Sequence, residues 1–296
     1  MKASICIATY NRPKQLLITI QEVLRQKSFS AVELLVIDQT PWENIEEIYR
    51  SRISALVEQG LLIYIRRNKP NLPAARNHAL SVAKGDVVIW IDDDVLLPDL
   101  FVENHLKNYE DKSVVAVGGL NYDRLNDVNI DEINLESIFD TTKVLPKATF
   151  VKYHDNFNDL VGANHSVRRE IAYTVKYDSN FIGYYEDTDF ALRLSASGYG
   201  RIVCDPDAWL VHLRAPTGGC RINKKNRWKE YLMAGPYILF RIRHNNSKYL
   251  ISETIRVGPL RKENVVRFWR QPYAWFSYFY AIIWAFQRKH RIDTSE

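Results

Sequence analysis

Three consecutive aspartates, Asp92, Asp93 and Asp94, follow a run of apolar and mostly β-branched residues at 87–91. Carboxylates this close repel one another, and folding alone does not require such a concentration of negative charge. One interpretation is a solvated turn at the end of a strand. The other is an oxygen-rich site for a divalent cation, because Mg²⁺ and Mn²⁺ prefer carboxylate ligands. The other polar residues of the chain must distinguish between the two.

A second acidic pair, Glu186 and Asp187, stands where a helical pattern begins, and this pattern ends before Gly198. Asp187 shares helical spacing with Phe190 and Leu194, so it falls on the apolar side of the predicted helix, in its first turn. The helix dipole favours a carboxylate there, and we expect it to stay ionised near neutral pH. Such a group suits a general base, although it can also serve only to stabilise the helix N-terminus.

His212 lies in an apolar, strand-like run that a Gly-Gly pair at 218–219 follows. An isolated histidine is more often structural than a ligand. Two aspartates and a neutral imidazole nevertheless suit Mn²⁺ or Mg²⁺ when a diphosphate completes the ligand shell. His212 is therefore a candidate third ligand beside the aspartates.

The elements that must position these residues form an α/β pattern. Five short apolar, mostly β-branched runs occur in the first 120 residues, at 3–9, 32–38, 61–66, 86–92 and 114–120. Helical patterns separate them, such as 13–26, where Pro13 suits a first helical turn. This alternation predicts a doubly wound, mostly parallel sheet.

Ligands of such sheets bind outside the carboxyl ends of the strands. The predicted strands end there in hydrogen-bonding residues, namely Thr9, Tyr10, Asn11 and Arg12, then Asp38, then the three aspartates. The sequence has no Gly-x-Gly-x-x-Gly after the first strand and no P-loop, which disfavours dinucleotide and P-loop nucleotide sites. A metal held by the aspartates would then have to take the place of backbone amides on a phosphorylated ligand.

The composition, with 46% hydrophobic and 25% charged residues, is typical of a folded chain rather than a disordered one. Three cysteines without Cys-x-x-Cys spacing predict neither a disulfide framework nor a zinc site. The N-terminal apolar run is interrupted too early for a signal peptide. We therefore expect the protein to stay in the cytoplasm.

The C-terminal part of the chain differs in charge from the rest. Residues 221–296 contain 16 Lys and Arg against five Asp and Glu, a net charge of +11, whereas residues 1–220 carry −6. We therefore expect a catalytic domain over 1–220 and a basic, aromatic-rich helical tail over 221–296. The apolar stretch within 267–291 is shorter than the ~20 residues that span a bilayer, but its aromatic and basic residues suit an anionic membrane surface. The alternative is a helix packed on the catalytic domain; nucleic acid is not an expected partner, because no nucleic-acid module accompanies the basic residues.

Five stretches, in order, resemble glycosyltransferase family 2, whose members are inverting, nucleotide-sugar-dependent enzymes with the metal-dependent A-type fold. The stretches are "CIATYNRP", "LLVIDQT", "NLPAARNHALSVAKGDVVIWIDDDVLLP", "LVGANHSVRRE" and "GYYEDTDFALRLSASGYG" continued to "DPDAWLVH", within about residues 3–213. The resemblance implies that fold over the catalytic domain.

The resemblance also implies roles for the candidate residues. Nucleotide-binding roles fall on Asp38 for the base or ribose, and on Thr9, Tyr10, Arg12 and Arg76 around it. Asp92 and Asp94 match the family's Asp-x-Asp element, with Asp93 between them as part of the cofactor-binding set. Asp94, Asp92 and His212 would hold Mn²⁺ or Mg²⁺, Asp187 would be the catalytic base, and Glu186 would support it.

The expected activity is sugar transfer from a nucleotide-diphosphate donor, a UDP-sugar in the first place, to a glycan or lipid-linked acceptor in cell-surface polysaccharide synthesis. Relatives often carry two acidic residues and a serine after the second strand, whereas this chain has Asp38, Gln39 and Thr40. The nucleotide base therefore stays open, and a rhamnosyltransferase using a dTDP-sugar is an alternative. A nucleotidyltransferase would carry a Gly-rich loop that is missing here, and a non-catalytic sugar-nucleotide-binding protein would not need the whole acidic set.

Overall fold

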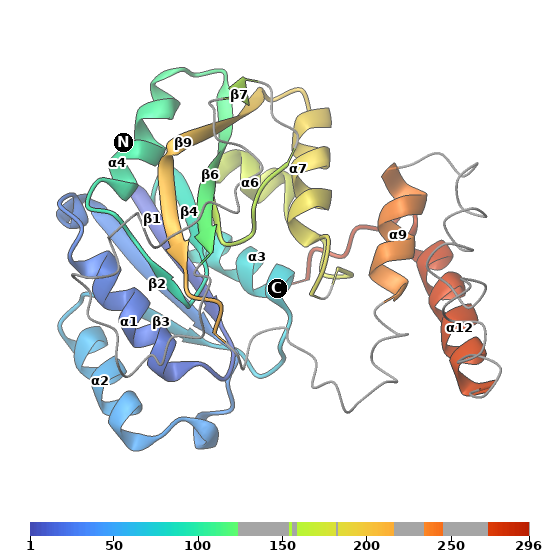
Figure 1. The fold of residues 1–296 in the computed structure, drawn as a ribbon, viewed down its shortest axis with the longest axis horizontal. Helices are drawn as coiled ribbons and strands as arrows, with labels where there is room; N and C mark the ends of the chain where they lie inside the picture. The colour runs from blue at the N-terminus through green and yellow to red at the C-terminus, as the bar shows by residue number, and fades with distance from the viewer. Residues whose placement is uncertain (124–153, 156–158, 182, 216–233, 245–271, 296) are drawn as a thin grey trace.

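The computed structural model describes residues 1–123, 154–155, 159–181, 183–215, 234–244 and 272–295. Figure 1 shows a sheet covered by helices and, beside it, a pair of helices from the C-terminal part of the chain. The segment 121–158 lies mostly outside the described residues, as do 221–233 and 245–271 of the predicted tail.

Nine strands form one mixed sheet within the described part of the chain. Their order along the main path is β3 (Ile63–Arg66), β2 (Val32–Asp38), β1 (Ala3–Thr9), β4 (Val87–Ile91), β8 (Asn164–Arg168), β6 (Val114–Asp123), β9 (Arg201–His212) and β5 (Val95–Leu96), with β7 (His154–Asp155) beside β9. Strands β3, β2, β1 and β4 are parallel, β8 is antiparallel to both its neighbours, and β6 is parallel to β9. The predicted α/β class is confirmed, and the five apolar runs are all strands.

Helices cover both faces of the sheet, and each face has its own apolar core. One core lies between the sheet and α1 (Pro13–Leu24), α2 (Glu47–Glu58) and α4 (Phe101–Leu106). The other lies between the sheet and α3 (Leu72–Val82), α6 (Arg169–Val175) and α7 (Glu186–Ala196). Short 3₁₀ turns occupy Phe29–Ala31, Trp42–Asn44 and Lys107–Glu110. Burial on both faces explains why the central strands are apolar throughout rather than alternating.

The register of the parallel strands brings their carboxyl ends together. Thr9 of β1 lies opposite Asp38 of β2, and Ile7 lies opposite Ile91, the last residue of β4. The acidic turn after β4 therefore begins at the same edge of the sheet as Asp38. This is the edge at which open α/β sheets bind ligands.

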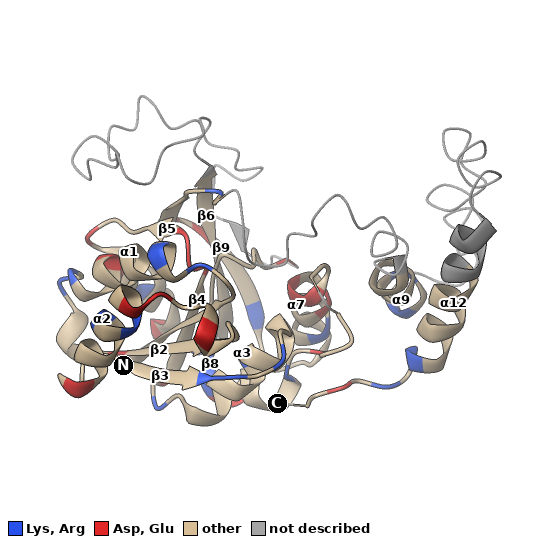
Figure 2. Ribbon diagram, turned by 90° about the horizontal axis from the view of Figure 1, so that it is seen from below, with Lys and Arg blue, Asp and Glu red and all other residues tan. Residues whose placement is uncertain are grey.

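The described part of the predicted tail is a helix pair, α9 (Ala234–His244) and α12 (Pro272–Arg288). Its apolar contacts join Leu239 and Ile242 of α9 to Ala281 and Ala285 of α12, and they include Phe181 of the catalytic part. The chain then runs back toward α3 (Figure 2), where the Ser179 amide donates to the Asp293 carbonyl at 2.6 Å. Helix α12 packs on α9, which itself belongs to the predicted tail, so the membrane surface, the packed-helix alternative and a domain boundary at residue 220 all stay predictions.

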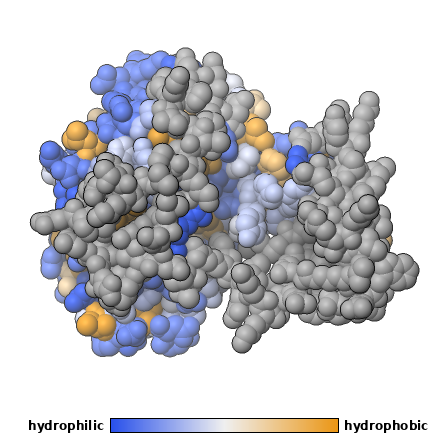
Figure 3. Space-filling model, viewed as in Figure 1, coloured by the Kyte–Doolittle hydropathy of each residue, from blue (hydrophilic) through white to orange (hydrophobic). Residues whose placement is uncertain are grey.

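None of the helices in the described residues is both long and apolar enough to cross a membrane. In the space-filling view, apolar side chains on the visible surface of the sheet domain are scattered rather than gathered into one patch (Figure 3). Four large apolar residues of α12 are exposed, namely Phe279, Tyr280, Ile283 and Phe286.

Candidate active site

Asp92, Asp94 and His212 form one group at the carboxyl edge of the sheet. Each offers a ligand atom, and these atoms lie within 4.8 Å of one another. His212 Nε2 is 3.1 Å from Asp94 Oδ1 and 3.6 Å from Asp92 Oδ2. The short strand β5 brings them together, because Val95, next to Asp94 in the chain, pairs with His212 at the end of β9. Two carboxylates and an imidazole are a donor set that fits a hard divalent cation.

The electrostatics of this group favour an anionic Asp94. Burial alone would raise its pKa, but the His212 hydrogen bond, the nearby positive charges and the Ala215 amide at 2.8 Å lower it overall. Burial would likewise lower the pKa of His212, and the two aspartates outweigh it and raise that pKa. Asp92 is the more open of the two carboxylates, with 36% of its side chain exposed. Burial and the charge of Asp94 raise the pKa of Asp92. The electrostatics therefore favour a charged Asp94–His212 pair, and Asp92 makes the group reachable from one side.

Asp93 does not belong to the Asp92–Asp94–His212 group; its side chain is hydrogen-bonded to Thr9 and Arg12. It is buried, and it accepts from Thr9 Oγ1 at 2.6 Å and from Arg12 Nη1 at 2.8 Å. Burial raises its pKa to about 7, although Arg12 acts in the opposite direction. Arg12 Nη1 also lies 3.4 Å from Asp94 Oδ2. Asp93, which Thr9 orients, therefore holds the guanidinium of Arg12 beside the Asp92–Asp94–His212 group. Tyr10 follows β1 at the same edge and is half-buried.

Asp38 is held by its own loop and by the neighbouring strand β3. It is buried, accepts from the Thr40 amide at 2.7 Å, and also accepts from the Tyr64 hydroxyl. Its neighbour Gln39 accepts from the Asn71 amide at 2.5 Å with its side-chain oxygen. Asn71 caps α3, so Gln39, at the position where relatives often carry an acidic residue, links the Asp38 loop to that helix.

Asp187 is paired with Arg76, which lies on α3. Nη1 of Arg76 donates to Oδ1 of Asp187, and Nη2 donates to the Gly162 carbonyl at 3.1 Å. The buried guanidinium lies over the rings of Tyr177 and Trp90, 5.1 and 5.8 Å from their centroids. The structure therefore places Arg76 against Asp187, the predicted catalytic base.

Opposing effects set the charge of the acidic pair. Burial raises the pKa of Asp187 to about 6, and Arg76 limits this rise. Burial and the charge of Asp187 raise the pKa of the buried Glu186 to about 7. The charge of Asp92 also raises the pKa of Asp187, so the two acidic groups are near enough to interact. A pKa of about 6 favours the ionised form of Asp187 at neutral pH and makes it more basic than a solvated aspartate.

Several supporting residues escaped the sequence analysis. Gly162 lies so close to Asp187 that an added Cβ would overlap its Oδ2 atom. Tyr177 stacks on Phe190 with ring centroids 4.1 Å apart, and its hydroxyl is 2.7 Å from His165 Nε2. Asn77, next to Arg76, binds both the amide and the carbonyl of Tyr177 at 2.8 Å. Gly162, Asn77 and His165 belong to the stretches that carry the family resemblance, but a pattern of residue types does not show which backbone groups they hold.

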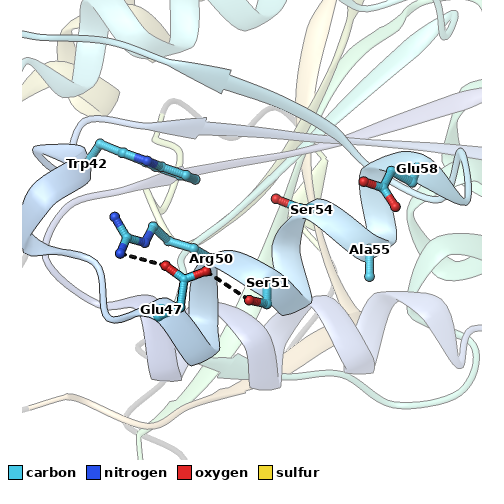
Figure 4. Close-up of a pocket in the computed structure, with 7 residues that line it drawn as sticks. All are labelled: Trp42, Glu47, Arg50, Ser51, Ser54, Ala55 and Glu58. Atoms are coloured by element: carbon cyan, nitrogen blue, oxygen red, sulfur yellow. Dashed lines mark hydrogen bonds and ion pairs between the residues drawn. The ribbon is translucent and has the colours of Figure 1, made fainter.

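Two cavities among the described residues lie apart from the metal-ligand candidates. One, of about 460 Å³, lies on α2, where Trp42, Arg50 and Glu47 face it (Figure 4). The other, of about 390 Å³, lies between the start of α3 and the C-terminal helix, with Arg67, Lys69 and Arg288 in its wall. Neither contains Asp92, Asp94, Asp187 or His212 in its lining.

Comparisons with solved structures place this fold among the A-type glycosyltransferases. The S. aureus TarS fragment 1–349, solved in complex with UDP-GlcNAc, has a TM-score of 0.62 at 14% identity, over 96% of this chain and 81% of that one. The mannosyltransferase PcManGT from Pyrobaculum calidifontis, solved with GDP-Man and Mn²⁺, has a TM-score of 0.58 at 16% identity, over 97% of this chain and 86% of that one.

Sequence comparisons point to the same group of proteins. The chain is 35% identical to the chondroitin synthase of Escherichia coli over 122 residues, which are 40% of this chain and 17% of that protein. It spans between 12% and 40% of the length of the five curated relatives compared with it. The profile described as Glycosyl transferase family 2 matches residues 4–175. Because this match covers more than half of the chain and includes Thr9, Asp38 and the three aspartates, the chain belongs to glycosyltransferase family 2.

Proposed function

We propose that this protein transfers a sugar from a nucleotide-diphosphate donor, a UDP-sugar in the first place, to a hydroxyl of a glycan or lipid-linked acceptor, with inversion at the anomeric carbon. The observation that carries the proposal is the proximity of two groups at one sheet edge. The Asp92–Asp94–His212 group fits a divalent cation, and Asp187 is an ionised carboxylate close enough for Asp92 to alter its pKa.

In this mechanism Asp187 removes the proton from the acceptor hydroxyl while that oxygen attacks the anomeric carbon. Attack from the face opposite the diphosphate inverts the centre. A divalent cation bound by Asp92, Asp94 and His212 would supply positive charge to the leaving diphosphate. Arg76 keeps Asp187 oriented, and its charge favours the ionised form that accepts the proton. Asp38, with Arg12 and Tyr10 nearby, would hold the nucleoside end of the donor.

The loop after β2 bears on the identity of the nucleotide base. Asp38 and Thr40 are hydrogen-bonded to each other within one loop, and Gln39 is bound to Asn71. A dTDP-sugar, as used by a rhamnosyltransferase, therefore remains the second candidate donor. A non-catalytic sugar-nucleotide-binding protein is the other alternative, but it would not need a basic carboxylate beside the donor site.

We further propose that the enzyme acts as a peripheral protein on the cytoplasmic face of a membrane. Two observations support this location. The predicted tail has a net charge of +11, and Phe279, Tyr280, Ile283 and Phe286 leave an exposed apolar face on α12. Basic residues beside such a face suit an anionic lipid surface.

A panel of nucleotide sugars tests the activity. Each donor is incubated with the full chain and Mn²⁺ or Mg²⁺, and binding and slow hydrolysis to the nucleoside diphosphate are measured. We expect one donor class to bind and to be hydrolysed only with the cation. The proposal is wrong if no donor binds, or if hydrolysis is unchanged in excess chelator.

Two variants divide the roles of the acidic groups. Asp94→Asn should lower the affinity for Mn²⁺, measured calorimetrically without donor, by at least about tenfold, because a charged ligand is lost. Asp99→Asn is the matched control, because Asp99 is an exposed carboxylate nearby that pairs with Arg25.

Asp187→Asn should keep donor affinity and lower turnover by on the order of 10²–10⁴.

A further inference from the structure

The turn that leads into α7 has an unfavourable backbone conformation. Tyr185, which directly precedes Glu186 and Asp187, has φ = 70°, and Gly183 has φ = 87°. A tyrosine in the left-handed region is conformationally strained, so the surrounding structure must stabilise it. The direction in which Asp187 leaves the first turn of α7 depends on this conformation.

Helix α9 packs directly on this turn. The Tyr185 ring is stacked on Phe240 with centroids 4.9 Å apart and an interplanar angle of 20°. The centroid of the Tyr237 ring lies 5.6 Å from that of Tyr185, with the rings tilted by 56°. Aromatic contacts from α9 therefore support the one strained non-glycine residue that adjoins the predicted base in the described structure.

Helix α9 also binds two fully buried carboxylates on either side of the turn. Nη1 of Arg243 lies 2.7 Å from Asp178 Oδ2 and 3.0 Å from Asp189 Oδ1. His244 Nε2 is 2.8 Å from the same oxygen of Asp189. Asp189 is in the first turn of α7, two residues from Asp187, and Asp178 precedes the turn. One guanidinium therefore spans the segment that sets the position of Asp187.

Arg243 also forms hydrogen bonds with residues at and just after the end of α12 and so links them to this segment. Nη2 of Arg243 donates to the carbonyls of Arg288 and Arg291 at 3.2 and 3.1 Å, at and just after the end of α12. The Asp293 amide donates to Asp178 Oδ1 at 3.0 Å. The position of α9 is therefore fixed by α12 as well as by α7.

We propose that Phe240, Arg243 and His244, here called the α9 clamp, are positioning residues for the catalytic base Asp187. The inference rests on the function proposed above. The clamp acts through Tyr185 and Asp189. Within the described part of the chain its hydrogen bonds, ion pairs and ring contacts do not reach the Asp92–Asp94–His212 group, which lies at the ends of β4, β5 and β9. Its loss should therefore slow the chemical step and leave donor binding intact. Helix α9 of the predicted tail would thus influence the rate of the reaction and not only the attachment of the protein to a membrane.

The test compares kcat with KM for donor hydrolysis, using the full chain and the donor found in the panel. Arg243→Gln should lower kcat by about ten- to a hundredfold, because small displacements of a reacting group cost rates of this order, while the donor KM stays within about twofold. Phe240→Leu should lower kcat several-fold, and Phe240→Tyr should restore it, because the stacked ring is kept. Arg201→Gln is the control, since it removes an arginine–aspartate pair with Asp111 at the opposite end of β9.

Equal losses in kcat and in affinity, or an unchanged kcat in both Arg243→Gln and Phe240→Leu, would overturn the proposal. If Arg243→Gln does not fold, Phe240→Leu decides, because it leaves the ion pairs in place. A wild-type chain that hydrolyses no donor disproves the proposed function instead. The clamp is then tested by amide exchange: faster exchange at 186–189 in Phe240→Leu, with unchanged exchange in β4, supports positioning, and equal exchange at 186–189 contradicts it.

Discussion

At the scale of single residues, Asp187 combines two properties that normally exclude each other. Burial makes its carboxylate more basic, and Arg76 keeps it charged at neutral pH. A solvated aspartate would be charged but a weak base, and a buried one without a cation would be protonated. The pair with Arg76 therefore explains how an aspartate with only 14% of its side chain exposed can accept a proton at physiological pH.

This balance predicts the pH dependence of turnover. A general base works only when deprotonated, so kcat should fall as the pH drops through about 6, where the pKa of Asp187 lies. In Arg76→Gln the opposing cation is lost, so the pKa should rise and the acidic limb should move to higher pH. The measurement is kcat for donor hydrolysis from pH 5 to 8. An acidic limb that stays in place in Arg76→Gln would argue against Asp187 as the titrating base.

Gly162 gives a second test at this scale. Gly162→Ala places a methyl group where Oδ2 of Asp187 now lies, so the carboxylate must move. We expect kcat to fall by about ten- to a hundredfold with little change in donor affinity. In Gly162→Ala combined with Asp187→Asn, the added methyl should cause no further loss, because the base is already absent. Additive losses would show that Gly162 acts on something other than Asp187.

At the scale of elements, the sequence predicted what depends on apolar burial. The strands β1, β2, β4 and β6 begin where their β-branched runs begin or within one residue of them, because both faces of the sheet are covered. Strand β8 was not predicted, because its first residues, Asn164, His165 and Ser166, are polar. They are buried all the same, since hydrogen bonds to His105 and Tyr177 satisfy them. Periodicity cannot detect a strand that hydrogen bonds stabilise in this way.

The same limit applies to the candidate site. The three aspartates at 92–94 could be predicted as a site because folding does not require three adjacent carboxylates at the end of a strand. The partner of Arg76 could not, because Asp187 lies 111 residues away in the chain. The resemblance suggested that Arg76 approaches the nucleotide, and it contained no information on the ion pair with Asp187. Contacts between α3 and α7 arise only once the sheet has formed.

Asn77 provides a prediction about the element contact beneath this site. Asn77→Ala removes both hydrogen bonds from α3 to the Tyr177 backbone and leaves two buried peptide groups without partners. We expect the free energy of unfolding to fall by about 3 kcal/mol in urea denaturation. Asn104→Ala, which removes a single exposed bond to the Asp207 carbonyl, should cost less than about 1 kcal/mol. Similar losses for the two variants would mean that the Tyr177 segment is held by its other contacts.

At the scale of the whole molecule, charge and exposed apolar surface are separated. The first 220 residues carry −6 and include both acidic groups of the candidate site, whereas residues 221–296 carry +11. Helix α12 buries Ala281 and Ala285 toward α9 and exposes another side of the helix. Its buried side thus serves the contact with α9, which leaves the exposed side available for the proposed membrane contact.

Substitutions on the exposed side of α12 test the membrane proposal without removing the helix. Ile283 and Ile48 are each 56% exposed, but Ile283 lies on the basic tail and Ile48 on α2. If α12 inserts into the interface, Phe279→Ser combined with Ile283→Ser should lower co-sedimentation with anionic vesicles by more than about tenfold, because each fully buried side chain contributes about 1.5–3 kcal/mol. Ile48→Ser should bind as the wild type does. Binding should weaken as salt rises, because each Lys or Arg near an anionic surface contributes about 1 kcal/mol, yet the apolar residues should leave a fraction bound in high salt. Equal binding of the α12 double variant and the wild type, or no binding of either, would contradict attachment through this face.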